Sequence, residues 1–161
     1  SDRLILLDGW SKTYAMTGWR LGYSVWPKTV VSHAEKLCVN IHSCVNASAQ
    51  FAGIAALKGD QSPVKKMVSA FDERRAVIVD QLNQLPGFNC IQPGVAFYTF
   101  PNIKETGMTS DELQKKLLEE AGVAVISGTS FGEYGEGYLR FSYANSTDNI
   151  LKAVASIKSC L

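Results

Sequence analysis

The chain has 161 residues, of which 46% are apolar and 19% charged, and its formal net charge is +1. This length suits one full domain, or one domain with a piece of another, and allows a real hydrophobic core. The composition excludes a disordered or collagen-like chain, and no apolar run approaches the roughly 18 residues of a membrane span. Because the charge is balanced and no Lys/Arg block is present, we expect no nucleic-acid partner. We also expect no membrane association and no signal peptide.

The cysteines and histidines indicate neither disulfides nor a metal site. The cysteines match no CxxC or zinc pattern, so we expect free, buried thiols in a reducing, cytoplasmic compartment; they are Cys38, Cys44, Cys90 and Cys160. His33 and His42 lie nine residues apart, about two and a half helical turns, and would face nearly opposite sides of a helix. The sequence therefore predicts no metal site.

Two strands and three helices are expected in the first half of the chain. The apolar run 3–7 predicts a buried strand, and residues 21–26 predict a second strand that Pro27 ends. A buried strand so near the start needs neighbours that the chain hardly supplies, which is a first indication of an incomplete protein. Apolar residues at helical spacing predict helices over 30–41, over 47–57 and from Pro63 to the Pro86-Gly87 pair.

Shorter elements are expected in the second half. Thr109 and Glu112 have the spacing of a capping box in front of an apolar helical pattern, and a last helix is expected to start near Ser146. The glycines between 128 and 137 match neither a dinucleotide nor a Walker phosphate loop, so we interpret them as turn formers. Strands are predicted over 88–92, 95–100, 123–126 and 138–143. The pattern from about residue 28 onward indicates an α+β domain with helices over a small, largely antiparallel sheet.

Lys12 has the most suggestive surroundings of any ionisable residue. A lysine in a loop is usually solvated, but this one follows an apolar strand and is surrounded by bulky residues: Trp10, Tyr14, Met16 and Trp19. Desolvation and a nearby cation, for which Arg20 is a candidate, would favour a neutral and nucleophilic amine. Arg20 could equally bind a phosphate through its forked guanidinium, and Ser11 adds a hydroxyl.

Three segments together resemble a known family. Residues 9–22 read GWSKTYAMTGWRLG, which resembles the pyridoxal-phosphate lysine motif of the class I/II aminotransferases, in the aspartate/aromatic branch. Residues 92–98 (QPGVAFY) resemble that family's PxGAFY segment, and 127–144 resemble its PGSxFGxxGxGxxRxSYA segment. Gly9 stands where many relatives have Ser, and Ser127 where Pro is common. The likeness covers essentially the whole chain, in order.

The resemblance implies specific roles. Lys12 would form a Schiff base with the aldehyde of pyridoxal 5′-phosphate and later move a proton at the substrate Cα. Arg20 would bind the cofactor phosphate, with Ser11 beside it. Arg140 would clamp the substrate carboxylate, although an arginine in such a strand is usually a surface or salt-bridge residue. Phe97 would lie near the substrate in the same segment as Tyr98, although both residues would most often only alternate along a strand.

The resemblance also implies the layout of the protein. Residues 1–27 would be a remnant of the large cofactor domain, 28–85 the connecting helices, and 86–161 the small C-terminal α+β domain of a fold-type-I enzyme. Because the family's ring-stacking aromatic and ring-nitrogen Asp lie upstream of the lysine, the chain is expected to be a fragment with little activity alone. The parent enzyme would be a cytoplasmic homodimer that acts on an amino acid, such as aspartate or an aromatic one, and a 2-oxo acid.

Other functions stay open from the sequence. The same lysine and arginine could serve a pyridoxal-phosphate C–S lyase, which would release pyruvate and ammonia without an amino acceptor. The chain could also be a non-catalytic association module, either a truncation or a degenerate partner subunit. An unrelated α+β domain with an accidental motif is the third alternative.

Overall fold

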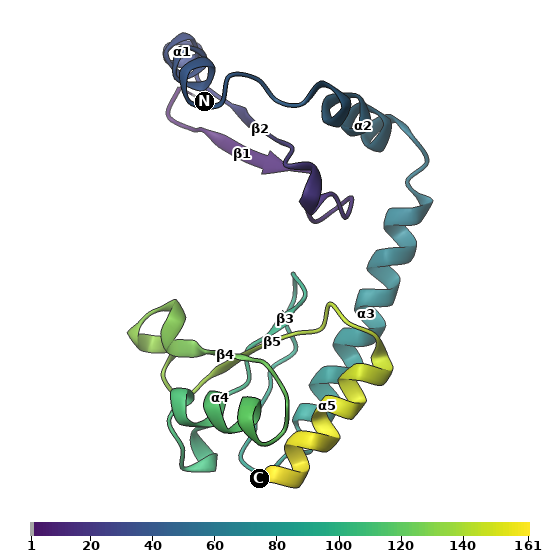
Figure 1. The fold of residues 1–161 in the computed structure, drawn as a ribbon, viewed down its shortest axis with the longest axis vertical. Helices are drawn as coiled ribbons and strands as arrows, with labels where there is room; N and C mark the ends of the chain where they lie inside the picture. Colours follow the sequence, from purple (N-terminus) through teal and green to yellow (C-terminus); the bar gives the residue numbers. More distant parts are fainter. Residues whose placement is uncertain (1) are drawn as a thin grey trace. The chain divides into compact units, whose positions relative to one another are not determined.

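A computed structural model describes residues 2–161 of the chain (Figure 1). The chain separates into two compact units, residues 1–66 and residues 67–161. The long helix α3 (Ser62–Leu82) contributes residues to both units. The mixture of helices with a small antiparallel sheet that the sequence predicts is present. The division into a cofactor-domain remnant, connecting helices and a small domain stays a prediction.

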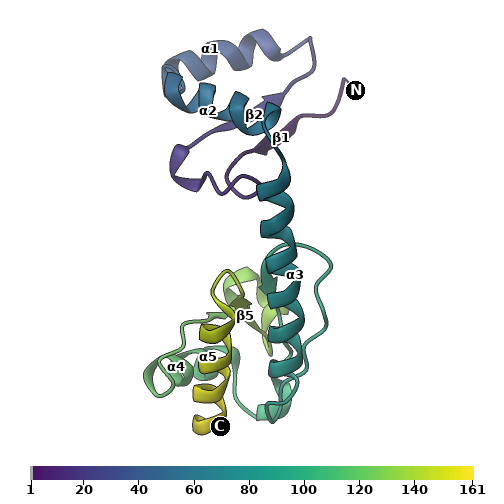
Figure 2. The ribbon, with the colours of Figure 1, turned by 90° about the vertical axis from the view of Figure 1, so that its right-hand side faces the viewer.

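The first unit is built around one β-hairpin. Strand β1 (Leu6–Gly9) pairs antiparallel with β2 (Gly22–Val25), from Leu6 opposite Val25 to Gly9 opposite Gly22. A 3-10 turn, η1 (Thr17–Trp19), lies in the connection. Helices α1 (Val31–His42) and α2 (Ala47–Lys58) follow, as Figure 2 shows. The Asn46 side chain accepts a hydrogen bond from the Ala49 amide (3.0 Å) and so caps the start of α2.

The prediction that the first strand is buried is wrong for the residues described. Leu4 is 60% exposed and Leu7 75% exposed, because the hairpin is a two-stranded sheet with open faces. Apolar side chains on both helices are exposed as well; they include Leu37, Val39, Ile41, Phe51 and Ile54. Cys38 and Cys44 are also exposed, which corrects the expectation of buried thiols, although all four cysteines are free. The first unit thus presents an extensive apolar surface to solvent.

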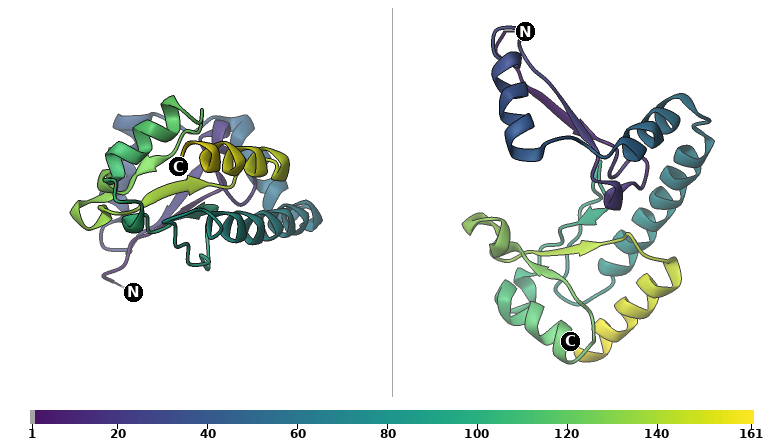
Figure 3. Two further views of the ribbon diagram at one scale, coloured as in Figure 1. Left: turned by 90° about the horizontal axis from the view of Figure 1, so that it is seen from below. Right: turned by 45° about the horizontal axis from the view of Figure 1, so that its top comes forward.

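The second unit is a three-stranded antiparallel sheet with helices beside it. The strand order is β3 (Tyr98–Thr99), β5 (Leu139–Ser142), β4 (Ile126–Ser127). Helices α4 (Ser110–Glu119) and α5 (Thr147–Cys160) lie on the same side of this sheet (Figure 3). Short 3-10 turns complete the unit: η2 (Lys104–Thr106), η3 (Gly128–Phe131) and η4 (Glu133–Gly135).

The three helices of this unit pack around one hydrophobic core. Helix α5 lies beside the C-terminal half of α3 in Figures 1 and 2. The core is formed by apolar side chains from the three helices, the loops and β5: Ile78, Leu82, Leu85, Phe88, Cys90, Ile103, Leu113, Leu117, Leu139, Phe141, Tyr143, Ile150, Val154 and Ile157. Burial of these side chains is the main stabilising contribution to the unit.

The strands of the second unit are shorter than the sequence predicts. The segment 88–92 forms only an isolated bridge, between Asn89 and Asn102. The strand expected over 95–100 is reduced to β3, because Ala96 has a φ of +67° that is incompatible with extended backbone. Of the segment 123–126 only Ile126 lies in a strand, β4, which continues to Ser127, and the segment 138–143 is reduced to β5.

The two predicted helix starts of this unit are confirmed. Thr109 and Glu112 form the reciprocal capping box in front of α4, and Ser146 caps α5 by accepting from the Asn149 amide (3.2 Å). The backbone N–H and the hydroxyl of Thr109 both donate to the Glu112 carboxylate. These hydrogen bonds, the backbone one most strongly, hold the pKa of that carboxyl below its usual value.

A buried serine joins α4 to the glycine-rich loop, and two glycines let that loop contact itself. The Ser110 hydroxyl accepts hydrogen bonds from the amides of Gly137 (2.8 Å) and Tyr138 (3.1 Å). Gly128 and Gly135 approach so closely that a Cβ on Gly128 would lie 2.0 Å from the Gly135 carbonyl oxygen. Glycine is therefore needed at both positions because a side chain would collide with the facing backbone. The interpretation as a turn former suits Gly132, which has a φ of +119°.

We expect Ser110→Ala to lower the free energy of unfolding by about 1–3 kcal/mol, because two largely buried amide donors lose their acceptor. Urea titration of the 161-residue chain measures this change. Ser69→Ala is the matched control, since Ser69 is exposed on α3. Equal stability of the two variants would contradict the role given to Ser110.

Candidate active site

A backbone hydrogen bond joins the two ends of the loop that carries Lys12, residues 10–21. The Trp10 amide donates to the Leu21 carbonyl (3.3 Å), which extends the β1–β2 pairing to the two ends of the loop. Inside the loop, the Tyr14 amide donates to the Trp10 carbonyl (3.1 Å) and the Ala15 amide to the Lys12 carbonyl (3.2 Å). These bonds give residues 10–21 a defined turn structure although their sequence has no clear period.

Helix α2 fixes this loop through Trp10. The indole Nε1 of Trp10 donates to the Gly53 carbonyl oxygen at 3.1 Å. A Cβ at Gly53 would lie 2.5 Å from the Leu21 Cδ2 atom and 3.3 Å from the Trp10 ring. Gly53 thus allows the loop to approach α2, and two residues of the loop, Met16 and Leu21, are buried. Sequence analysis did not single out Gly53, because this contact joins positions 43 residues apart.

The side chains of this loop that the sequence singled out differ in exposure. Ser11 is half-buried, whereas Lys12 and Arg20 are exposed. Lys12 is therefore open to solvent in residues 2–161, in contrast to the desolvated position that its bulky sequence neighbours suggested.

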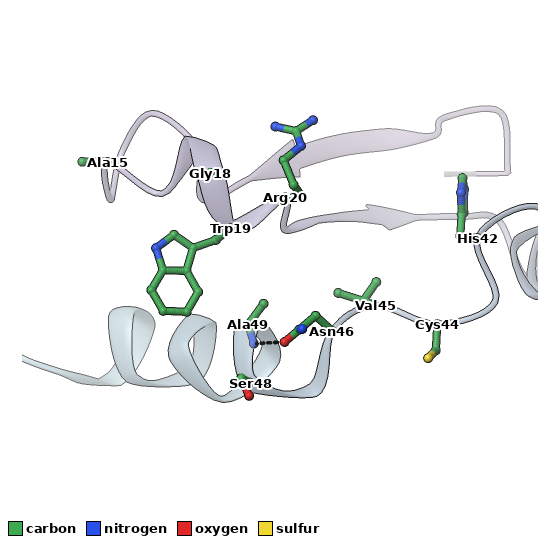
Figure 4. A pocket seen from close by; sticks show the side chains of 10 residues that line it. All are labelled: Ala15, Gly18, Trp19, Arg20, His42, Cys44, Val45, Asn46, Ser48 and Ala49. Atoms are coloured by element: carbon green, nitrogen blue, oxygen red, sulfur yellow. Dashed lines mark hydrogen bonds between the residues drawn. The ribbon is translucent and has the colours of Figure 1, made fainter.

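Arg20 lies at the rim of a hollow in the first unit. Its backbone is in the left-handed region (φ +53°, ψ +48°), which is uncommon outside glycine. The guanidinium donates through one nitrogen, Nη1, to the Thr17 carbonyl (3.0 Å). Figure 4 shows the hollow, with Arg20 and Trp19 on one side and His42 and Asn46 on the other. Lys12 is not among the lining residues.

Arg140 occupies the central strand of the second unit and contacts two aromatic rings. Its Cζ lies 4.4 Å from the centre of the Tyr98 ring and 4.5 Å from that of Phe131. The side chain is half-buried, opposite Ile126 in the neighbouring strand. The salt-bridge interpretation of Arg140 does not apply to residues 2–161, where the ion pairs are Arg75–Asp72 and Lys115–Glu119.

Phe97 belongs to the irregular segment before β3. Its ring contacts those of Phe71 (5.9 Å between centres) and Tyr98 (4.5 Å), so it packs against the core. Tyr98 and Phe131 both lie on Arg140. The sequence placed the segment of Tyr98 near the substrate but did not single out Phe131, whose position depends on the path of the glycine-rich loop and has no local sequence signal.

Comparison with known proteins decides the family. The family model described as "Aminotransferase class I and II" matches residues 1–157. The chain belongs to the class I and II aminotransferases. Enzymes of this family use pyridoxal 5′-phosphate.

Individual relatives agree with this assignment. An aspartate aminotransferase of Pyrococcus horikoshii is 43% identical over 99% of this chain, and an aromatic-amino-acid aminotransferase of Thermococcus litoralis is 36% identical. The crystal structure of an aromatic aminotransferase from Pyrococcus horikoshii matches 98% of this chain and 42% of its own, with a TM-score of 0.93 and 38% identity. The chain spans about two fifths (41%) of the length of these curated relatives.

The residues of the aminotransferase loop fit this cofactor chemically. An exposed primary amine at Lys12 can attach to an aldehyde, and the guanidinium of Arg20 retains N–H groups that suit a phosphate. The left-handed backbone of Arg20 and of Ala15 (φ +53°) shows a loop held in an uncommon conformation, which is frequent at ligand sites. Within residues 2–161, no cluster of three or more metal-ligating side chains is found. No helix in that range is long and apolar enough to cross a membrane.

We expect Gly53→Leu to detach the Lys12 loop from α2, because the new side chain needs the space that Leu21 and Trp10 occupy. Overpacking of this kind costs about 1–3 kcal/mol, and tryptic cleavage after Lys12 and Arg20 should become faster. Ala55→Leu is the control, since Ala55 is exposed on the same helix. Similar cleavage rates for both variants would show that Gly53 does not hold the loop.

Proposed function

We propose that the chain is the part of a pyridoxal-phosphate aminotransferase that carries the attachment lysine, one phosphate ligand and the substrate-carboxylate arginine. The full enzyme would transfer an amino group between an amino acid, aspartate or an aromatic one, and a 2-oxo acid. The names of its relatives, which are aspartate and aromatic-amino-acid aminotransferases, support these substrates. We further propose that the full enzyme is a cytoplasmic homodimer.

When bound, pyridoxal phosphate supplies an aldehyde for attachment of amines and a ring that takes up electrons from the substrate Cα. Lys12 provides the amine for this attachment and, once released, holds the proton that moves at the Cα. Arg20 binds the phosphate through its guanidinium, and the hydroxyl of Ser11 adds a hydrogen bond. The closed loop of residues 10–21 holds these three groups on one segment.

Arg140 binds the substrate carboxylate in this proposal. A planar guanidinium matches a carboxylate with two parallel hydrogen bonds, which orients the amino acid as well as binding it. Phe97 supports this part of the site from the segment before β3. Its ring packs against the Tyr98 ring that contacts Arg140.

One observation carries the proposal: an exposed lysine and an arginine with unused donors lie on a single loop whose backbone is closed and anchored to α2. An ordinary solvated loop lysine needs no such anchoring. The fixed loop limits the conformations that Lys12 and Arg20 can adopt, so the entropy lost on cofactor binding is smaller.

The test is incubation of the chain with pyridoxal phosphate, borohydride reduction and mass mapping of the peptides. We expect selective tagging at Lys12, and a loss of most of this tagging in Arg20→Met, because the phosphate loses its guanidinium. Lys28→Met is the control for general lysine reactivity. Equal tagging of several lysines by the folded chain would refute the assignment of Lys12.

We also expect the 161-residue chain alone to show little or no transaminase activity. It spans about two fifths of the length of its relatives, and its Lys12 amine is exposed to water. Aspartate with 2-oxoglutarate, followed by detection of glutamate, measures the activity. Robust turnover by the pure chain would overturn this expectation, and release of pyruvate and ammonia from a cysteine thioether without an acceptor would instead indicate a lyase.

A further inference from the structure

The guanidinium of Arg140 is held by aromatic rings. Its Cζ lies within 4.5 Å of the centres of both the Tyr98 and the Phe131 rings. Within residues 2–161 the side chain is in neither of the two ion pairs and donates no hydrogen bond. A ring contact uses the flat face of a guanidinium and leaves its N–H groups available at the edge. The position of the Tyr98 ring, together with that of Phe131, therefore decides where these donors are presented.

Tyr98 follows a segment of irregular backbone. Ala96, two residues earlier, has a φ of +67°, a conformation that costs free energy for any residue with a Cβ. Such a conformation persists only where surrounding contacts impose it. The contacts that impose it on residues 93–97 are therefore the contacts that place Tyr98.

Two side chains supply these contacts through backbone carbonyls. Arg75 on α3 donates from Nη1 to the Pro93 carbonyl oxygen at 3.0 Å. Tyr143, just after β5, donates from its hydroxyl to the Ala96 carbonyl at 2.8 Å and from its amide to the Phe97 carbonyl at 3.0 Å. Both ends of the irregular segment are therefore tied to regular elements of the same unit.

The two anchors are themselves fixed. Arg75 forms an ion pair with Asp72, one turn earlier on α3. Tyr143 is 1% exposed and its ring packs edge-on against Phe71 (6.2 Å between centres). Burial raises the pKa of the Tyr143 hydroxyl, while the charge of Arg75 opposes that rise, so the hydroxyl is a donor at neutral pH.

We propose that Arg75 and Tyr143 are positioning residues for Arg140: they hold the segment 93–97, which sets the Tyr98 ring on which the guanidinium rests. This inference rests on the proposed function only in giving Arg140 a carboxylate to bind. A pre-positioned guanidinium loses less rotamer freedom when the carboxylate arrives, so the anchors would contribute to affinity without touching the substrate.

The first measurement is the NMR signal of the Arg140 Nε–Hε group in the 161-residue chain, assigned by its disappearance in Arg140→Lys. Two nearby ring faces should displace it from the signals of exposed arginines. We expect Tyr143→Phe and Arg75→Met each to remove more than about half of this displacement, since either change frees one end of the segment. Tyr98→Leu, which leaves both anchors intact, should have the same effect.

The second measurement is titration with maleate as a dicarboxylate probe. Since immobilising one long side chain costs about 0.5–1.5 kcal/mol, we expect both anchor variants to weaken binding by about two- to ten-fold. The controls are Tyr134→Phe, since Tyr134 is 91% exposed, and Arg74→Met, whose arginine lies over Phe71 and contacts no carbonyl of the segment. Neither control should change the signal or the affinity.

The outcomes separate this inference from the proposed function. An undisplaced Arg140 signal in the original chain, or a displacement that survives in the folded anchor variants, overturns the positioning role. If Tyr143→Phe does not fold, Arg75→Met at the other end of the segment decides the same question. Maleate binding that is unchanged in Arg140→Lys would instead refute Arg140 as the carboxylate ligand, while the NMR displacement still tests the positioning.

Discussion

Hydrogen bonds between single side chains and the backbone hold every irregular segment that carries a candidate site residue. The Trp10 indole ties the Lys12 loop to the Gly53 carbonyl, and Arg75 and Tyr143 tie the segment 93–97 through its carbonyls. Ser110 does the same for the glycine-rich loop by accepting from two amides. Backbone polar groups outside helices and sheets need partners when they are buried, and Arg75, Tyr143 and Ser110 supply such partners. Trp10 acts differently, because it anchors its own loop to a carbonyl of helix α2.

The two units differ in how completely they bury their apolar residues. The second unit has a closed core in which Leu82, Leu117 and Ile157 are fully buried. In the first unit the hairpin has open faces, and α1 and α2 expose apolar side chains such as Ile41 and Phe51. A two-stranded sheet is marginally stable in water without packing on its faces. The first unit therefore depends on contacts such as Trp10–Gly53 that tie the hairpin loop to α2.

The sequence predicted the helices well because their signals are local. Apolar spacing and the caps at Thr109 and Ser146 determine where helices begin and which face is buried. The strands were predicted too long, since a single residue such as Ala96 with a positive φ interrupts extended backbone without any sequence signal. The close approach of Gly128 to Gly135, and the position of Phe131 on Arg140, arise from the folded path of the chain and are invisible to spacing rules.

Arg75 and Arg140 show why residue type alone does not identify a binding group. Both are partly buried arginines in the same unit. Arg75 donates to Asp72 and to the Pro93 carbonyl, whereas the guanidinium of Arg140 stacks against two aromatic rings. A guanidinium that is fixed by its carboxylate partner has little left to offer a ligand. A guanidinium whose flat faces contact aromatic rings keeps its N–H groups and its charge available for an anion. The difference lies in the contacts of the two side chains, and it separates an arginine that shapes the site from one that can bind in it.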